Sequence, residues 1–115
     1  MVKRDLDLAK QVIEEDDEID MLREYIRDRS IELMALRQPM ARDLRYIYAL
    51  GSIAIELERI GDYSVNIAKE QLKIGNETYI KELVDIPKMA QGCREMILEA
   101  KKALEENDEK LAYLV

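Results

Sequence analysis

The chain has 115 residues, of which 37% are charged, and its 18 Lys and Arg against 25 Asp and Glu give a formal net charge of -7. One Cys and the absence of His exclude disulfide scaffolds, multi-cysteine zinc sites, imidazole acid–base chemistry and the Glu-x-x-His di-iron bundle. The acidic balance disfavours nucleic acid as a partner, no apolar run is long enough to span a membrane, and the N-terminus lacks a signal peptide's apolar segment, so we expect a cytoplasmic protein.

Three long segments with helical periodicity and few helix-breaking residues make up most of the chain. The first covers about residues 5–36 and ends before Pro39, because the residue preceding a proline disfavours the helical conformation. The second covers about residues 40–72, with Pro39 expected at its first position and the Gly75-Asn76 pair as its end. A connection this short makes the two helices antiparallel.

The second segment is apolar on two nearly opposite sides, so we expect it to be buried on both. One side contains Ile53, Ile60 and Ile67. The other side carries small residues that would let a neighbouring helix approach closely. These are Gly51, Ala54 and Gly61.

The third segment has a short lead-in over residues 78–85 and a main helix over about 87–113, which Asn107-Asp108 could interrupt. Cys93 lies in the apolar stripe of this helix, and we interpret it as a small core residue. No duplicated block is apparent. The sequence therefore predicts one all-α domain over residues 1–115, an antiparallel helical hairpin plus a third helix.

Four carboxylates fall at matching heights of the predicted hairpin. Positions equally far from the turn at Pro39 lie level, which pairs Asp20 with Glu58 and Asp16 with Asp62. Each helix then presents an acid-x-x-x-acid pair one turn apart on one face. Like charges at this spacing repel one another. Burying each of them without a partner costs on the order of several kcal/mol.

Two arrangements would relieve this repulsion between the carboxylates. In a third interpretation the carboxylates are exposed to water, which screens their repulsion. Arg23 and Arg59 could pair with the carboxylates, or bound cations could, and all-oxygen ligands suit Mg²⁺, Ca²⁺, Mn²⁺ or iron. Alternatively, the acidic pairs are solvated, as is common on charged helices. Glu58 is the informative member, because an acid within an apolar stripe needs a partner.

Basic residues cluster at the turn of the predicted hairpin. They are Arg37, Arg42 and Arg45. They could meet an acidic partner or phosphate groups, or they could form an ordinary solvated tip.

Two stretches of the chain resemble the PhoU family of phosphate-uptake regulators. The first is Leu36-Arg37-Gln38-Pro39-Met40-Ala41-Arg42-Asp43-Leu44-Arg45, and the second is Leu57-Glu58-Arg59-Ile60-Gly61-Asp62 followed by Asn66-Ile67-Ala68. Upstream, Val12-Ile13-Glu14-Glu15-Asp16 with Glu18-Ile19-Asp20 matches the same pattern. The resemblance covers about residues 7–70, in order and spacing.

The resemblance implies an all-helical protein with two similar three-helix units in tandem. It implies multinuclear metal clusters, with iron, zinc, manganese or magnesium as candidates, on Asp16, Asp20, Glu58 and Asp62. The family is cytoplasmic and non-catalytic, links the phosphate ABC transporter to a membrane sensor histidine kinase, and represses the phosphate-starvation response. Contact with a membrane would be indirect, through these partners.

This chain departs from the family pattern in length, because it is too short for two units and lacks the first helix of the first unit. Its third helix corresponds to the first helix of the second unit. We therefore expect a homodimer, in which each third helix completes the hairpin of its own chain or, by domain swapping, of its partner. The alternatives are a carboxylate-bridged metalloenzyme on a helical bundle and a plain helical oligomerisation module.

Overall fold

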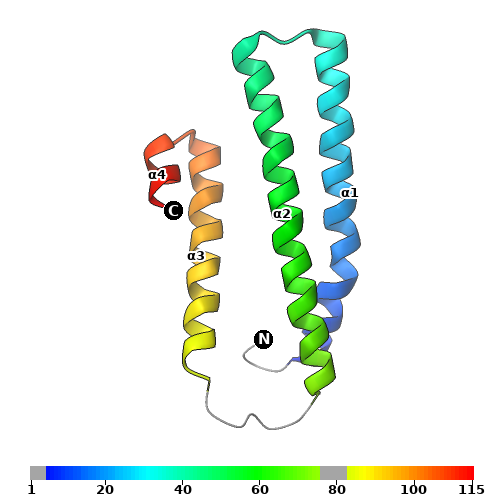
Figure 1. The fold of residues 1–115 in the computed structure, drawn as a ribbon, viewed down its shortest axis with the longest axis vertical. Coiled ribbons are helices and arrows are strands. Elements are labelled where there is room, and N and C mark those ends of the chain that lie inside the picture. The colour runs from blue at the N-terminus through cyan, green and yellow to red at the C-terminus, as the bar shows by residue number, and fades with distance from the viewer. Residues whose placement is uncertain (1–4, 76–82) are drawn as a thin grey trace. The chain divides into compact units, whose positions relative to one another are not determined.

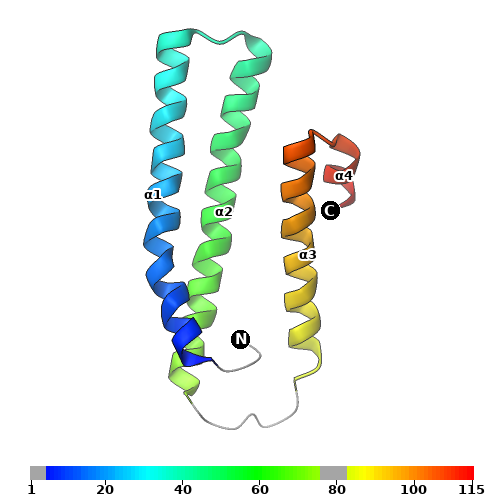
Figure 2. The ribbon, with the colours of Figure 1, turned by 180° about the vertical axis from the view of Figure 1, so that it is seen from behind.

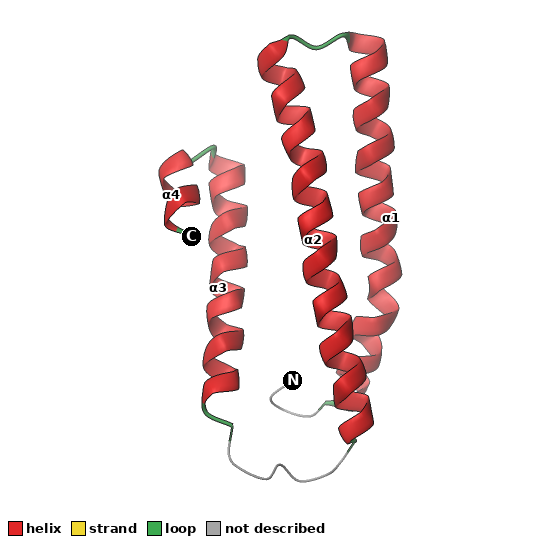
Figure 3. Ribbon diagram, in the orientation of Figure 1, coloured by secondary structure: helices red, strands yellow, loops and turns green. Residues whose placement is uncertain are grey.

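The computed structural model describes residues 5–75 and 83–115, and within these ranges it contains helices and no strand (Figure 1, Figure 3). The helices are α1 (Leu6–Arg37), α2 (Ala41–Ile74), α3 (Asp85–Glu106) and α4 (Glu109–Leu114). The predicted all-α fold is confirmed. Most of the expected lead-in over 78–85 lies outside the described residues, and its last residue, Asp85, begins α3.

The chain divides into two compact units, one containing α1 and α2 and the other α3 and α4. In the first unit the two long helices run antiparallel, side by side (Figure 1, Figure 2). The carboxylate of Asp5 caps α1 by accepting a hydrogen bond from the backbone N–H of Leu8 at 3.0 Å. Gln38, in the left-handed conformation with φ of 43°, ends α1.

The second helix begins and ends at backbone signals. Met40 occupies its N-cap with an extended backbone and Ala41 is the first helical residue, so the prediction that Pro39 takes the first helical position is wrong by two residues. At the other end Gly75 has φ of 62° and donates its N–H to the carbonyl of Gln71 at 3.0 Å. A residue without Cβ adopts this conformation without strain, which explains the glycine.

Small side chains form the core of the hairpin. Its buried apolar residues are Ala9, Ala54, Gly61, Val65 and Ala68. On the opposite side of α2, Ile60 is 42% exposed and Ile67 is 54% exposed. Within this hairpin α1 covers only one side of α2, so burial of the other side stays a prediction about contacts outside the hairpin.

The second unit has two helices, α3 and α4, and the break between them lies at the Asn107-Asp108 pair where the sequence predicted an interruption. Asn107 has φ of 52° and ends α3, and the carboxylate of Asp108 caps α4 by accepting a hydrogen bond from the N–H of Leu111 at 3.0 Å. Asn tolerates the left-handed conformation and Asp favours the N-cap, so this pair breaks the helix. Cys93, predicted in a core, is exposed, because α3 contacts only the six-residue α4 within this unit.

The beginnings of α1 and α4 repeat one another. In both, an N-capping Asp is followed by Leu and Ala three and four positions later and by Val at the seventh. The two sets are Asp5, Leu8, Ala9, Val12 and Asp108, Leu111, Ala112, Val115. The likeness is limited to these spaced positions, and the N-capping Asp108 accounts for a new helix starting at Glu109.

Candidate metal centre

A glycine allows α1 to pass close to α2 at the height of the predicted carboxylates. A Cβ placed on Gly61 would lie 3.2 Å from Cδ1 of Ile19 and 3.6 Å from Oδ1 of Asp16. A larger residue here would push against α1 directly beside Asp16. Gly51, by contrast, has no neighbouring atom within 4 Å of such a Cβ, so the prediction that it also permits close approach is wrong.

Three of the four predicted carboxylates converge from the two helices. One oxygen each from Asp16, Asp20 and Asp62 lies within 4.8 Å of the others, with Asp16 and Asp20 half-buried and Asp62 exposed. Oxygen ligands lie about 2.0–2.6 Å from Mg²⁺ or Ca²⁺, so ligands on opposite sides of one ion are up to about 5 Å apart. The spacing therefore fits a single hard cation held between α1 and α2.

Two residues of this cluster each have a carboxylate oxygen that is shielded from water and has no hydrogen-bond partner in the described part of the chain. Oδ1 of Asp16 and Oδ1 of Asp20 are buried atoms that accept no hydrogen bond from any residue in the described ranges 5–75 and 83–115. Buried polar atoms in folded proteins nearly always have a partner. A bound cation would provide one for both oxygens at once.

The electrostatic strain of the cluster is concentrated on Asp20. Desolvation raises the pKa of this carboxyl, and the negative charges of Asp16, Glu58, Asp62 and Asp17 raise it further, in that order. Both causes disfavour the ionised form of Asp20. A cation bound beside Asp20 would act in the opposite direction and favour its ionisation.

Glu58, the fourth predicted carboxylate, has another partner. Its Oε2 lies 2.5 Å from Nη1 of Arg23, across the interface between α2 and α1. The contact is an ion pair but is not aligned as a hydrogen bond. Arg59, the other predicted candidate, is paired instead with Glu56 on its own helix at 3.3 Å. The sequence thus predicted correctly that Glu58 needs a partner, and the structure selects Arg23.

The residues fit, in kind, a metal of the type that the resemblance implies. Asp16, Asp20 and Asp62 offer oxygen ligands only, which suits hard cations such as Mg²⁺, Mn²⁺ or iron better than it suits zinc without His or Cys. Glu58 is close enough for its charge to act on Asp20. Metal binding itself stays a prediction.

A cavity of about 260 Å³ lies between the same two helices, nearer the turn, and the sequence analysis did not predict it. It is lined by Arg23, Arg27, Ser30, Ile31, Met34, Ile47, Tyr48, Gly51, Ser52 and Ile55. None of the four carboxylates is among these residues. The available signal was Gly51, whose missing side chain leaves space between helices that have no close contact at this height.

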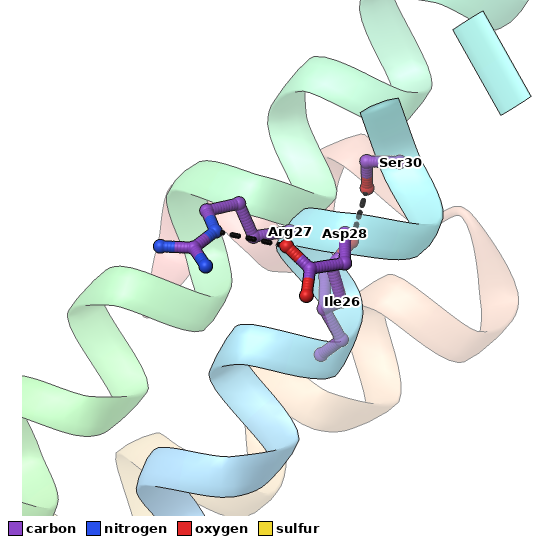
Figure 4. A network of polar contacts seen from close by, with 4 residues as sticks. All are labelled: Ile26, Arg27, Asp28 and Ser30. Atoms are coloured by element: carbon purple, nitrogen blue, oxygen red, sulfur yellow. Dashed lines mark hydrogen bonds and ion pairs between the residues drawn. The ribbon is translucent and has the colours of Figure 1, made fainter. Parts of the chain in front are cut away.

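The two arginines of the cavity have different partners. Arg23 reaches across to Glu58 on α2, whereas Nε of Arg27 pairs with Oδ1 of its neighbour Asp28 on α1 at 3.2 Å (Figure 4). One turn along, the hydroxyl of Ser30 donates to the carbonyl of Ile26 at 2.6 Å (Figure 4). Arg27 is therefore a natural control for Arg23, because it lines the same cavity without contacting the carboxylate cluster. The arginines of the turn, Arg37, Arg42 and Arg45, are exposed.

Comparison with known proteins agrees with this architecture. A family described as the PhoU domain matches residues 1–71. A phosphate-specific transport system accessory protein PhoU homolog from Aquifex aeolicus is 37% identical, over 92% of this chain and 53% of that protein. Proteins of the same description from Clostridium acetobutylicum and Thermotoga maritima are 34% and 36% identical, over 98% and 92% of this chain and 52% and 46% of their own lengths.

The structure is thus of the class of antiparallel helical hairpins with facing acid-x-x-x-acid pairs. The chain belongs to the PhoU family. It spans about half the length of the curated relatives that it matches. None of the helices in the described part of the chain is both long and apolar enough to cross a membrane.

Proposed function

We propose that this chain is a PhoU-type accessory protein of phosphate uptake and that it binds metal through Asp16, Asp20 and Asp62, with Glu58 as a further ligand. The metal part of the proposal is carried by the convergence of three carboxylates within 4.8 Å, two of which, Asp16 and Asp20, also have a buried oxygen without a hydrogen-bond partner among the described residues. The shared family and the names of the relatives carry the phosphate part.

The regulatory role follows from the family. The chain acts in the cytoplasm without catalysing a reaction, associates with the phosphate ABC transporter and with a sensor histidine kinase, and represses the phosphate-starvation response. Its relatives are named accessory proteins of a transport system, which supports a binding role over an enzymatic one. The metal would fix α1 against α2 and so stabilise the surface that partners recognise, because a ligand that binds only the folded state stabilises it.

The rival functions differ from this proposal in what they require. A metalloenzyme needs a substrate pocket beside an open metal position, but the cavity of the hairpin is lined by none of the four carboxylates. A plain oligomerisation module needs no metal, and the Arg23–Glu58 ion pair is the observation that favours it. Metal content distinguishes the module from the other two, and a turnover assay distinguishes the enzyme.

The regulatory proposal can be tested in a bacterial strain that lacks its own PhoU-type protein and carries a reporter on a phosphate-starvation promoter. We expect this chain to lower reporter expression in high phosphate, and we expect the double variant Asp16→Asn, Asp62→Asn to lose this effect. Glu18→Gln is the control, since at about 100° per residue it lies on the opposite side of α1 from Asp16. Equal reporter expression with and without the chain would contradict the proposal.

A further inference from the structure

Arg23 makes an unusual contact among the charged residues of the hairpin. In the described part of the chain, its ion pair with Glu58 is the one that joins two helices, and the others link residues one, three or four positions apart on the same helix. Arg23 follows Asp20 by three positions, so its side chain leaves α1 on the same face, one turn nearer the cavity. It therefore lies at the boundary between the carboxylate cluster and the cavity.

The ion pair with Arg23 involves Glu58, the one predicted metal ligand that does not converge with the three aspartates. Glu58 is only 19% exposed at its side chain, and its carboxylate is directed to Arg23 while Asp16, Asp20 and Asp62 converge on one another. As placed, Glu58 does not belong to the group of oxygens within 4.8 Å that the three aspartates form. Its carboxylate therefore has to move to become a ligand, and that movement would weaken the contact of its Oε2 with Nη1 of Arg23.

The cavity supplies room for Arg23 to leave. The side chain of Arg23 is 41% exposed and lines the cavity of about 260 Å³, so a released guanidinium can remain hydrated there instead of being stranded in an apolar core. The pair is also not aligned as a hydrogen bond, which lowers the cost of breaking it.

We propose that Arg23 is an internal competitor of the metal: it holds Glu58 in the metal-free protein, and Glu58 becomes a ligand only when Arg23 swings into the cavity. This inference rests on the proposed metal site and concerns how its affinity is set. Arg23 is a positioning residue, because it acts through Glu58. Half-exposed ion pairs stabilise proteins modestly, so we expect removal of the competitor to tighten metal binding about fivefold.

The experiment is a titration of Mn²⁺ into metal-free protein by calorimetry, with wild type, Arg23→Gln, Arg23→Lys and Arg27→Gln. We expect Arg23→Gln to bind Mn²⁺ about fivefold more tightly than wild type, from the strength of such pairs. Arg23→Lys should stay close to wild type, because it keeps a cation beside Glu58. Arg27→Gln removes an equal charge from the same cavity and should leave the affinity unchanged, since Arg27 pairs with Asp28.

A second background separates competition from simple charge repulsion. Glu58→Gln removes the carboxylate for which Arg23 and the metal compete. In that background the added substitution Arg23→Gln should therefore no longer tighten Mn²⁺ binding. If it still tightens binding there, Arg23 acts only through its electric field and the inference is overturned. Equal Mn²⁺ affinity of wild type and Arg23→Gln also overturns it while leaving the metal site intact, whereas absence of Mn²⁺ binding in every variant refutes the proposed metal function itself. Circular dichroism of each variant checks that the helices remain.

Discussion

At the scale of single residues, Asp20 has an unfavourable position among the described residues. Its carboxyl is half-buried, one of its oxygens accepts no hydrogen bond within the described ranges, and burial and four neighbouring acids raise its pKa. Carboxylates with raised pKa values and no structural partner are typical of functional positions. Protonation of Asp20 or a bound cation would relieve this unfavourable position.

The raised pKa of Asp20 predicts a specific pH dependence for the metal-free protein. Between the ordinary value of 3.8 and the raised pKa, the folded chain holds a proton that the unfolded chain has released. The contribution of Asp20 to stability is therefore fully present below 3.8 and is lost as the pH rises through the raised pKa. In Asp20→Asn this loss is absent, so the variant should melt increasingly above wild type as the pH approaches 7.

Thermal melts in a chelator at a series of pH values measure this difference. Glu18→Gln is the control, because it removes a charge from the opposite side of α1. Parallel melting curves for wild type and Asp20→Asn across the whole pH range would show that Asp20 is not destabilised in the folded state.

At the scale of helices, two glycines of α2 serve the hairpin differently. A Cβ on Gly51 would meet no atom within 4 Å, whereas one on Gly61 would press on Ile19 and lie next to Asp16. Glycine within a helix is less favourable than alanine by about 0.5–1 kcal/mol. Only Gly61 has a packing reason to be glycine.

The pair Gly51→Ala and Gly61→Ala tests this difference. We expect Gly51→Ala to raise the free energy of unfolding by about 0.5–1 kcal/mol, as helix propensity alone predicts. Gly61→Ala gains the same propensity but displaces α1, so it should be less stable than Gly51→Ala and should bind Mn²⁺ more weakly. Denaturant unfolding compares the two, and equal stabilisation by both substitutions would contradict the close approach at Gly61.

The helices show what the sequence could and could not predict. The bounds of α1 and α2 and the height of the four carboxylates follow from helical periodicity and a short turn, which are local properties of the chain. The choice of Arg23 over Arg59 as the partner of Glu58 depends on which long side chain reaches across the interface, and spacing does not determine that. The exposure of Cys93 was missed because a stripe pattern predicts an apolar face without saying what covers it.

At the scale of the whole molecule, each unit leaves an apolar face uncovered by its own described residues. Ile60 and Ile67 are exposed on α2, and Met89 and Ile97 are exposed on α3. Isolated apolar residues are ordinary on a protein surface, but stripes along two helices indicate an interaction surface. The chain also spans about half the length of the curated relatives that it matches.

We expect these faces to associate in a homodimer, with the third helix packed on its own chain or exchanged with the partner. Light scattering at micromolar concentration should give twice the chain mass of 13.4 kDa. Ile60→Glu with Ile67→Glu should lower the mass to that of one chain while the helical signal is kept, because two charges cannot be buried unpaired. A wild-type mass of 13.4 kDa would contradict the dimer.

The central claim is that the carboxylates between α1 and α2 bind metal. The measurement that tests it most directly is the metal content of the purified chain after dialysis, determined by elemental analysis. Melting curves in Mg²⁺, Mn²⁺, Fe²⁺ and Zn²⁺ accompany it. We predict at least one metal ion per chain for wild type, a melting temperature raised by its cation, and loss of both in Asp16→Asn with Asp62→Asn. That variant should melt above metal-free wild type, because it removes repelling charges. Wild type without bound metal, whose melting temperature no cation raises more than that of the double variant, would contradict the claim and leave the cluster a charged face.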